Sequence, residues 1–136
     1  MPSKALETLR AGYAAFNRGD LDSIFEMGPP DFELQTADRV TNPGTYRGRD
    51  EARRFFDDLF APFDEVLIEP EQYLANGDQV VVLVTIRSRP RGSSAVVENR
   101  IAHVWTVRDD ELVRLHVFPE REKGLEAAGL AGYGTK

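Results

Sequence analysis

The chain has 136 residues, and 17 Lys and Arg against 23 Asp and Glu give a formal net charge of −6. Hydrophobic residues make up 41% of the sequence and charged residues 29%, which is typical of a folded domain and not of a disordered chain. A chain of this length usually forms one domain, so we expect residues 1–136 to fold as a single unit. The acidic balance and the lack of a basic stripe argue against a general nucleic-acid surface.

The sequence also limits cofactors and location. It has no Cys and two His, which removes thiolate chemistry and an all-His metal site, and no Gly-rich phosphate loop is present. We therefore expect neither a metal nor another cofactor. The N-terminus lacks the pattern of a signal peptide, and the longest apolar stretch, Val80 to Val84, is far shorter than the roughly 20 residues that span a bilayer. These features predict a cytoplasmic protein with no membrane partner.

Helical periodicity dominates the first half of the chain. Apolar residues recur three and four positions apart in the first segment: Leu6, Leu9, Tyr13 and Phe16. This spacing predicts a helix with one apolar face, ended by Gly19. Asp20 can cap a short second helix over residues 21–25. Gly48 leads into a third helix, which ends before Pro62 and has a wide apolar stripe: Ala52, Phe55, Phe56, Leu59 and Phe60.

The rest of the chain predicts strands. Alternation indicates a short strand at residues 32–36, followed by a turn-rich stretch at 37–46. Further strands are expected at residues 66–73, 79–89, 95–108 and 112–118, and a short helix at 120–128. Helices early and an antiparallel meander late define an α+β class. We expect three N-terminal helices on one face of a curved, mostly antiparallel sheet, forming a cone whose apolar inside opens at one end.

Alternation along residues 95–108 predicts which side chains face the inside of this cone. One face has the largest apolar residues and is expected to point inward: Val97, Asn99, Ile101, His103, Trp105 and Val107. The other face mixes polar and apolar residues: Glu98, Arg100, Ala102 and Val104. Such a mixture suits a partly polar interface, so we expect a homodimer through the sheet.

His103 is the strongest candidate for chemistry. It can act as a general base or as a hydrogen-bonding contact for a ligand near neutral pH. The plainer interpretation is a structural His satisfied by a backbone carbonyl or a Tyr hydroxyl. Burial should lower the pKa of His103 unless a carboxylate lies beside it. A carboxylate or a Tyr within hydrogen-bond reach of His103 inside the cavity would favour catalysis over binding alone.

The same patterns place further residues on the wall of the expected apolar cavity. They are Tyr13, Phe16, Phe32, Leu34, Thr36, Phe55, Phe56, Asn99, Ile101, Trp105 and Val117. Tyr13 and Thr36 can add hydroxyls, and Asp38 a carboxylate, although core packing is the plainer interpretation of Tyr13. The Arg clusters at residues 47–54 and 87–91 are interpreted as solvated ion pairs.

Three segments of the chain match a known family in their order: "YAAFNRGDLDSIFEM", "YRGRDEARRFFDDLF" and "HVWTVRDDELVRLHVFPE". They resemble the nuclear transport factor 2-like superfamily, in particular its SnoaL-like branch of small polyketide cyclases and relatives. The resemblance covers residues 4 to 130 and implies the cone-shaped fold and pairing through the sheet. The resemblance predicts the function less well than the fold, because this fold occurs in isomerases, cyclases, epoxide hydrolases, dehydratases and binding modules.

The resemblance also implies positions at which to look for catalytic residues. The positions that match the acid–base set of ketosteroid isomerase-like enzymes hold Gly12, Thr36 and Ala102 or His103, and no Asp–Arg–Asp set for epoxide hydrolysis is found. SnoaL-type cyclases pair an acid on the final strand with a His on the preceding strand. His103 matches that His, whereas the acid position holds Val117, or His116 in a register shifted by one.

Two functions follow from these residues. One is an isomerase- or cyclase-type enzyme for a small hydrophobic substrate, in which His103 is the acid–base group and Asn99, Thr36 or Tyr13 orients the substrate. The alternative is a non-catalytic module of the same fold that holds an apolar ligand or a protein partner.

Overall fold

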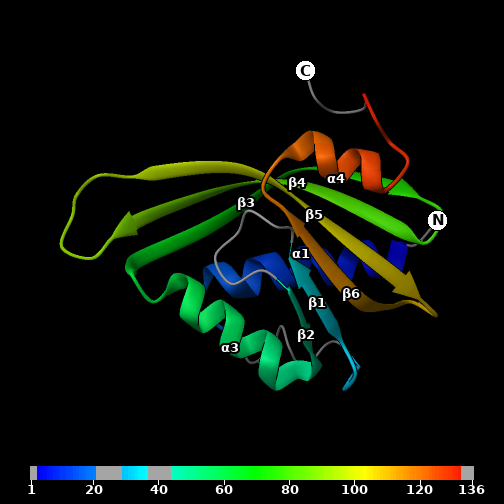
Figure 1. The fold of residues 1–136 in the computed structure, drawn as a ribbon, viewed down its shortest axis with the longest axis horizontal. Helices are drawn as coiled ribbons and strands as arrows, with labels where there is room; N and C mark the ends of the chain where they lie inside the picture. The colour runs from blue at the N-terminus through cyan, green and yellow to red at the C-terminus, as the bar shows by residue number, and fades with distance from the viewer. Residues whose placement is uncertain (1–2, 21–28, 37–43, 133–136) are drawn as a thin grey trace.

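The computed structural model describes residues 3–20, 29–36 and 44–132 of the chain. Figure 1 shows a long, curved sheet that carries helices on both of its faces. The elements are α1 (Ser3–Asn17), β1 (Glu33–Thr36), β2 (Gly44–Arg47), α3 (Gly48–Phe60), β3 (Phe63–Asn76), β4 (Gln79–Pro90), β5 (Val97–Arg108), β6 (Glu111–Phe118) and α4 (Arg121–Ala127). Within the described ranges, none of the helices combines the length and the apolar character needed to cross a lipid bilayer.

Six strands form one sheet in the order β2-β1-β6-β5-β4-β3. Strands β3 to β6 make an antiparallel meander, β1 pairs in parallel with β6, and β2 pairs antiparallel with β1. Because side chains alternate along a strand, β5 presents residues 101, 103 and 105 on one face and residues 100, 102 and 104 on the other. The helices divide between these two faces.

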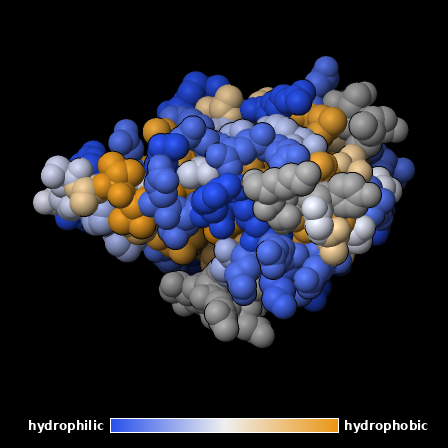
Figure 2. Space-filling view, turned by 90° about the horizontal axis from the view of Figure 1, so that it is seen from above, coloured by the Kyte–Doolittle hydropathy of each residue, from blue (hydrophilic) through white to orange (hydrophobic). Residues whose placement is uncertain are grey.

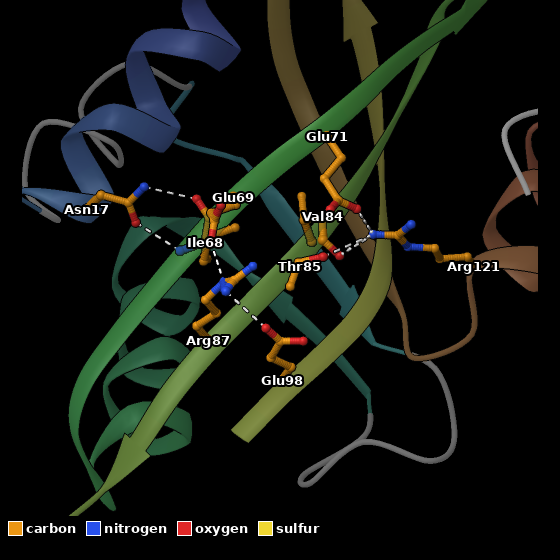
Figure 3. Close-up of polar contacts among 9 residues, drawn as sticks. All are labelled: Asn17, Ile68, Glu69, Glu71, Val84, Thr85, Arg87, Glu98 and Arg121. Atoms are coloured by element: carbon orange, nitrogen blue, oxygen red, sulfur yellow. Dashed lines mark hydrogen bonds and ion pairs between the residues drawn. The ribbon is translucent and has the colours of Figure 1, made fainter. Parts of the chain in front are cut away.

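The inner face of the sheet is covered by α1 and α3, whose apolar stripes the sequence predicts. Leu9 of α1 packs against the Val-rich inner face of β4, and α3 packs Ala52 and Phe55 against β1 and β6. At the end of α1, the Asn17 side chain donates to the Ile68 carbonyl and accepts from the Ile68 N–H, both at 2.9 Å (Figure 3). This pair of hydrogen bonds fixes where α1 meets β3.

The outer face of the sheet is partly covered by α4. Leu125 is fully buried there, against a cluster that includes Ala102 and Val104. The sequence predicted these two β5 residues at a partner interface. The structure corrects that prediction for both, because the chain's own C-terminal helix covers them. Gly124 permits the close approach, since a Cβ atom at this position would come within 2.6 Å of the Ala102 Cβ.

Beyond α4, ion pairs line the outer face. Arg121 pairs with Glu71 and so ties the start of α4 to β3, and Arg87 pairs with Glu69 and Glu98 across three strands (Figure 3). These contacts confirm ion pairing for the second predicted Arg cluster. Most of these side chains are about half exposed, so each pair contributes little to the free energy of unfolding.

The α+β class and the curved sheet confirm the sequence prediction, but the helix arrangement differs. The described helices are α1, α3 and α4, and α4 is C-terminal and lies on the opposite face from the other two. The expectation of three N-terminal helices on one face is therefore not matched. The helix predicted at residues 21–25 and the turn residues 37–43 lie outside the described residues.

Strand β2 lies in a stretch that the sequence predicted as a turn. Its residues are exposed or half-buried, so they show no hydrophobic alternation that could have revealed a strand. The strand forms through backbone pairing with β1. The Thr36 hydroxyl supports that pairing, because it accepts a hydrogen bond from the Gly44 N–H at 2.9 Å.

We expect Gly124→Ala to lower the free energy of unfolding by about 1–3 kcal/mol, because the added methyl group overpacks the contact with Ala102. Urea denaturation measures the effect. Gly12→Ala in α1 is the matched control, since its Cβ would meet nothing within 4 Å, and it should stabilise the helix by about 0.5–1 kcal/mol. Adding Ala102→Gly should restore much of the loss in the Gly124→Ala variant. Equal stability of the two single variants would show that α4 does not pack this closely.

Candidate functional site

Three aromatic side chains meet on the inner face of the sheet and form what we call the Tyr13 cluster, which consists of Tyr13, His103 and Trp105. The hydroxyl oxygen of Tyr13 lies 2.7 Å from Nδ1 of His103. Nε1 of Trp105 donates to the same oxygen at 3.1 Å. Helix α1 supplies Tyr13 from its apolar stripe, and β5 supplies the other two residues from alternate positions on one face.

The surroundings of the Tyr13 cluster are apolar. His103 is 4% exposed and has Val82 of β4 and Val117 of β6 as its neighbours across the sheet. Tyr13 is 6% exposed, and the ring of Tyr73 approaches it edge-on, with 6.5 Å between the centroids. The cluster is therefore a small polar centre inside a hydrophobic layer.

Burial shifts the pKa of two members of the cluster. It lowers the pKa of His103 to about 4, as the sequence predicted, and desolvation is the cause. Burial raises the pKa of the Tyr13 hydroxyl, even though the hydrogen bond from Trp105 opposes the shift. Both side chains are thus neutral near pH 7. In the described part of the chain, no carboxylate forms an ion pair with His103.

The other predicted wall residues occupy two adjoining layers of the inner face. Five of them are buried: Phe32, Leu34, Thr36, Phe55 and Val117. Four more are partly buried: Phe16, Phe56, Ile101 and Trp105. Ile101 and Trp105 contact both the α1 layer and the α3 layer, so they join the two. The ring of Phe32 lies 6.3 Å from that of Trp105, which connects the α3 layer directly to the Tyr13 cluster.

Some predicted polar groups are not brought to His103. Asn99 is exposed and lies four residues along β5 from His103, a distance of roughly 13 Å along a strand. The Thr36 hydroxyl is engaged by the backbone of Gly44. Asp38 lies outside the described residues. Neither Asn99 nor Thr36 therefore supports the orienting role expected from the sequence.

His116 lies on the outer face, because it alternates along β6 with Leu115 and Val117, which belong to the inner layer. Its ring packs on that of Phe118, with 4.0 Å between the centroids, and Phe118 belongs to the layer beneath α4. Partial burial lowers the pKa of His116, and the nearby Arg114 lowers it further. His116 therefore cannot supply the acid that SnoaL-type cyclases place on the inner side of the final strand.

Sequence reasoning named a Tyr hydroxyl as an expected partner of His103 but missed that Tyr13, 90 positions away, supplies it. Each residue was assigned to the correct face, but no local pattern specifies which helix residue meets which strand residue. It also missed a surface hollow of about 200 Å³ beside α3, lined by Tyr46, Glu51, Arg54, Phe55 and Asp58. Among the described residues, no group of three or more His, Cys, Asp and Glu side chains is placed to hold a metal ion.

A curved sheet with helices on its inner face is the architecture of nuclear transport factor 2-like proteins, and solved structures of that description share it. The family model described as "SnoaL-like domain" matches residues 9–115, and the chain belongs to this family. An uncharacterised protein of Mycobacterium tuberculosis is 31% identical over 114 residues, covering 83% of this chain and 86% of the relative. An uncharacterised protein of Mycobacterium bovis matches equally well.

Solved structures share the fold at low sequence identity. TerC, co-crystallised with polyporic acid, has a TM-score of 0.76 at 22% identity and covers 93% of this chain and 98% of its own. A Jannaschia protein described as a SnoaL-like polyketide cyclase has a TM-score of 0.68 at 19% identity, covering 85% of each chain. A hypothetical protein with a ketosteroid isomerase-like fold from Catenulispora acidiphila, in complex with trimethylamine, has a TM-score of 0.71 at 16% identity and covers 96% of this chain and 98% of its own. These similarities establish the fold.

Proposed function

We propose that this chain binds a small hydrophobic molecule against the inner face of its sheet, with His103 as the acid–base group of an isomerase- or cyclase-type reaction. The observation that carries the proposal is the Tyr13 cluster, which places hydrogen-bonding groups at the centre of a hydrophobic layer. A site that is apolar apart from a few convergent polar groups is typical of small-molecule binding.

The comparisons support a small ligand at this fold. TerC was co-crystallised with polyporic acid, and the Catenulispora protein is in complex with trimethylamine. The Jannaschia structure is described as a SnoaL-like polyketide cyclase, which supports the reaction class. The Tyr13 hydroxyl lies 2.7 Å from Nδ1 of His103, a contact that is expected both for a catalytic His beside a Tyr and for a structural His satisfied by a Tyr hydroxyl.

A non-catalytic binding module of the same fold is the second candidate. The low pKa of His103, about 4, favours it, because a general base works best with a pKa near the operating pH. In this case His103 contributes a hydrogen bond to the ligand and no proton transfer occurs.

The variant His103→Gln distinguishes the two functions. Glutamine keeps much of the hydrogen bonding but cannot act as an acid or base. A thermal-shift screen of polyporic acid and polycyclic ketones first finds a ligand, and chromatography then follows its conversion. For an enzyme, we expect His103→Gln to retain binding and to lose turnover by at least about 100-fold, the usual contribution of acid–base catalysis. For a binding module, the wild type shows no turnover and the variant changes affinity only modestly.

The control for this experiment is His116→Gln, because His116 lies on the outer face next to Phe118. This variant should leave binding and turnover unchanged. If no compound in the screen stabilises the wild-type protein, both functions are wrong. If His103→Gln fails to fold and no cavity reaches residue 103, both roles of His103 are wrong and it is a structural residue of the core.

We also propose a homodimer through the sheet, at the end formed by the β4–β5 hairpin. Val96 and Val97 are 61% and 42% exposed there, and Figure 2 shows hydrophobic residues toward that end of the molecule. Light scattering at tens of micromolar should give a mass near twice 15.3 kDa. Val96→Asp should shift the mass toward that of the monomer, because an exposed apolar contact is lost. A wild-type mass near 15.3 kDa contradicts this proposal.

A further inference from the structure

The hydrogen bonds at the Tyr13 hydroxyl determine where its proton points. An indole N–H can only donate, so the Tyr13 oxygen accepts from Trp105. A phenol has a single proton, and that proton remains available for one acceptor. The acceptor within reach is Nδ1 of His103, at 2.7 Å from the oxygen.

The protonation of His103 follows from this arrangement. A neutral imidazole has one N–H group and one acceptor nitrogen. If Nδ1 carried the proton, the Tyr13 oxygen would accept two donors, and its own proton would need a further acceptor. Among the described residues, the contacts of the Tyr13 hydroxyl are those to His103 and Trp105. The other arrangement satisfies every group, with Nδ1 accepting from Tyr13 and the proton on Nε2.

We propose that Tyr13 is a positioning residue that holds His103 in the Nε2–H tautomer, so that the site selects ligands with an oxygen acceptor, such as a ketone, over ligands with an amine. This inference rests on the proposed function and specifies its ligand class. Among the described residues, the hydrogen bond of the His103 ring is the one at Nδ1, so the Nε2–H group is the polar group that the cluster leaves for a ligand. A neutral donor at this point also stabilises negative charge that develops on a ligand oxygen during enolisation.

Two further features of the site support this ligand class. Desolvation holds the pKa of His103 at about 4, so the ring is neutral near pH 7. The tautomer alone then determines whether Nε2 presents a hydrogen-bond donor or an acceptor to a ligand. The surrounding side chains, such as Val82 and Val117, are apolar. A protonated amine at Nε2–H would therefore meet a donor in a desolvated layer, with no acceptor to compensate it.

The tautomer can be measured directly in the ligand-free protein. Long-range ¹H–¹⁵N correlation spectra at pH 7 distinguish Nε2–H from Nδ1–H, and His103→Gln and His116→Gln assign the two ring signals. We expect a single Nε2–H tautomer for His103 in the wild type and a mixture in Tyr13→Phe, which has no hydroxyl. Tyr73→Phe is the matched control, because Tyr73 touches Tyr13 only edge-on, and it should keep the single tautomer. An Nδ1–H tautomer in the wild type overturns the proposal, whether or not Tyr13→Phe folds.

The ligand class is tested with three probes of one carbon skeleton: acetophenone, 1-phenylethylamine and ethylbenzene. We expect acetophenone to shift the His103 ¹⁵Nε2 signal saturably, and the other two probes to leave it unchanged. A larger shift with the amine overturns the proposed ligand class while leaving the proposed function intact. If all three probes leave the signal unchanged, although the screen finds binders, the ligand class is again wrong. If the screen also finds none, the proposed function fails with it.

Discussion

Phe55→Ala should lower the free energy of unfolding by about 3–5 kcal/mol, the usual cost of truncating a buried Phe to Ala. Phe55 is 3% exposed and lies at the centre of the layer between α3 and the sheet, among Phe32, Leu34 and Leu115. Its ring also contacts that of Tyr46, with 4.9 Å between the centroids. Truncation leaves a cavity bounded by two elements that cannot easily collapse into it. Urea denaturation followed by fluorescence of the single Trp measures the loss.

The neighbouring residue provides the control for this measurement. Phe56 lies one position along α3, is only partly buried, and packs against the rings of Phe55 and Phe60. Because water already reaches its side chain, Phe56→Ala should cost clearly less than Phe55→Ala. The sequence stripe does not separate the two residues, since both fit the helical spacing. Equal losses would show that α3 is rotated relative to the arrangement described above.

The sequence predicted the fold correctly where apolar residues recur with a regular spacing over several helical turns or along a long strand. The stripes of α1 and α3 and the alternation along β5 assign their residues to the correct faces. Two features were not predictable in this way. Strand β2 forms through backbone pairing with β1 and has no alternation of its own. The position of α4 depends on the close approach of Gly124 to Ala102, which no periodicity indicates.

The candidate site was predictable only in part, for a related physical reason. Alternation identified His103 and Trp105 as inward-facing, and the helical stripe identified Tyr13 as part of the core. Their mutual hydrogen bonds depend on how α1 crosses the sheet, which the Asn17 contacts to Ile68 help to fix. For Asn99, alternation alone was not sufficient. Asn99 shares a face of β5 with His103, but its side chain is exposed to solvent.

His103 should make the stability of the protein fall as the pH falls from about 6.5 to about 4. Its pKa is near 6.5 in the unfolded chain and about 4 in the folded protein, so the unfolded state binds more protons throughout this range. Stability therefore rises with pH across the range and is complete above the unfolded value. At 1.36 kcal/mol per pH unit, the loss between pH 6.5 and pH 4.5 amounts to about 2–3 kcal/mol.

The variant His103→Gln isolates this contribution from that of the carboxylates, which also titrate at low pH. Glutamine does not titrate, so the stability advantage of the wild type over His103→Gln should shrink by about 2–3 kcal/mol between pH 7.5 and pH 4.5. Urea denaturation at these two pH values measures the difference. His116→Gln retains the buried His103, so its free energy of unfolding should depend on pH almost as steeply as that of the wild type. Burial lowers the pKa of His116 as well, but this side chain is only half-buried, so its contribution is smaller. If the wild type and His103→Gln differ in free energy of unfolding by the same amount at both pH values, His103 is solvated in the folded protein. It is then not the buried, neutral group of the proposed site.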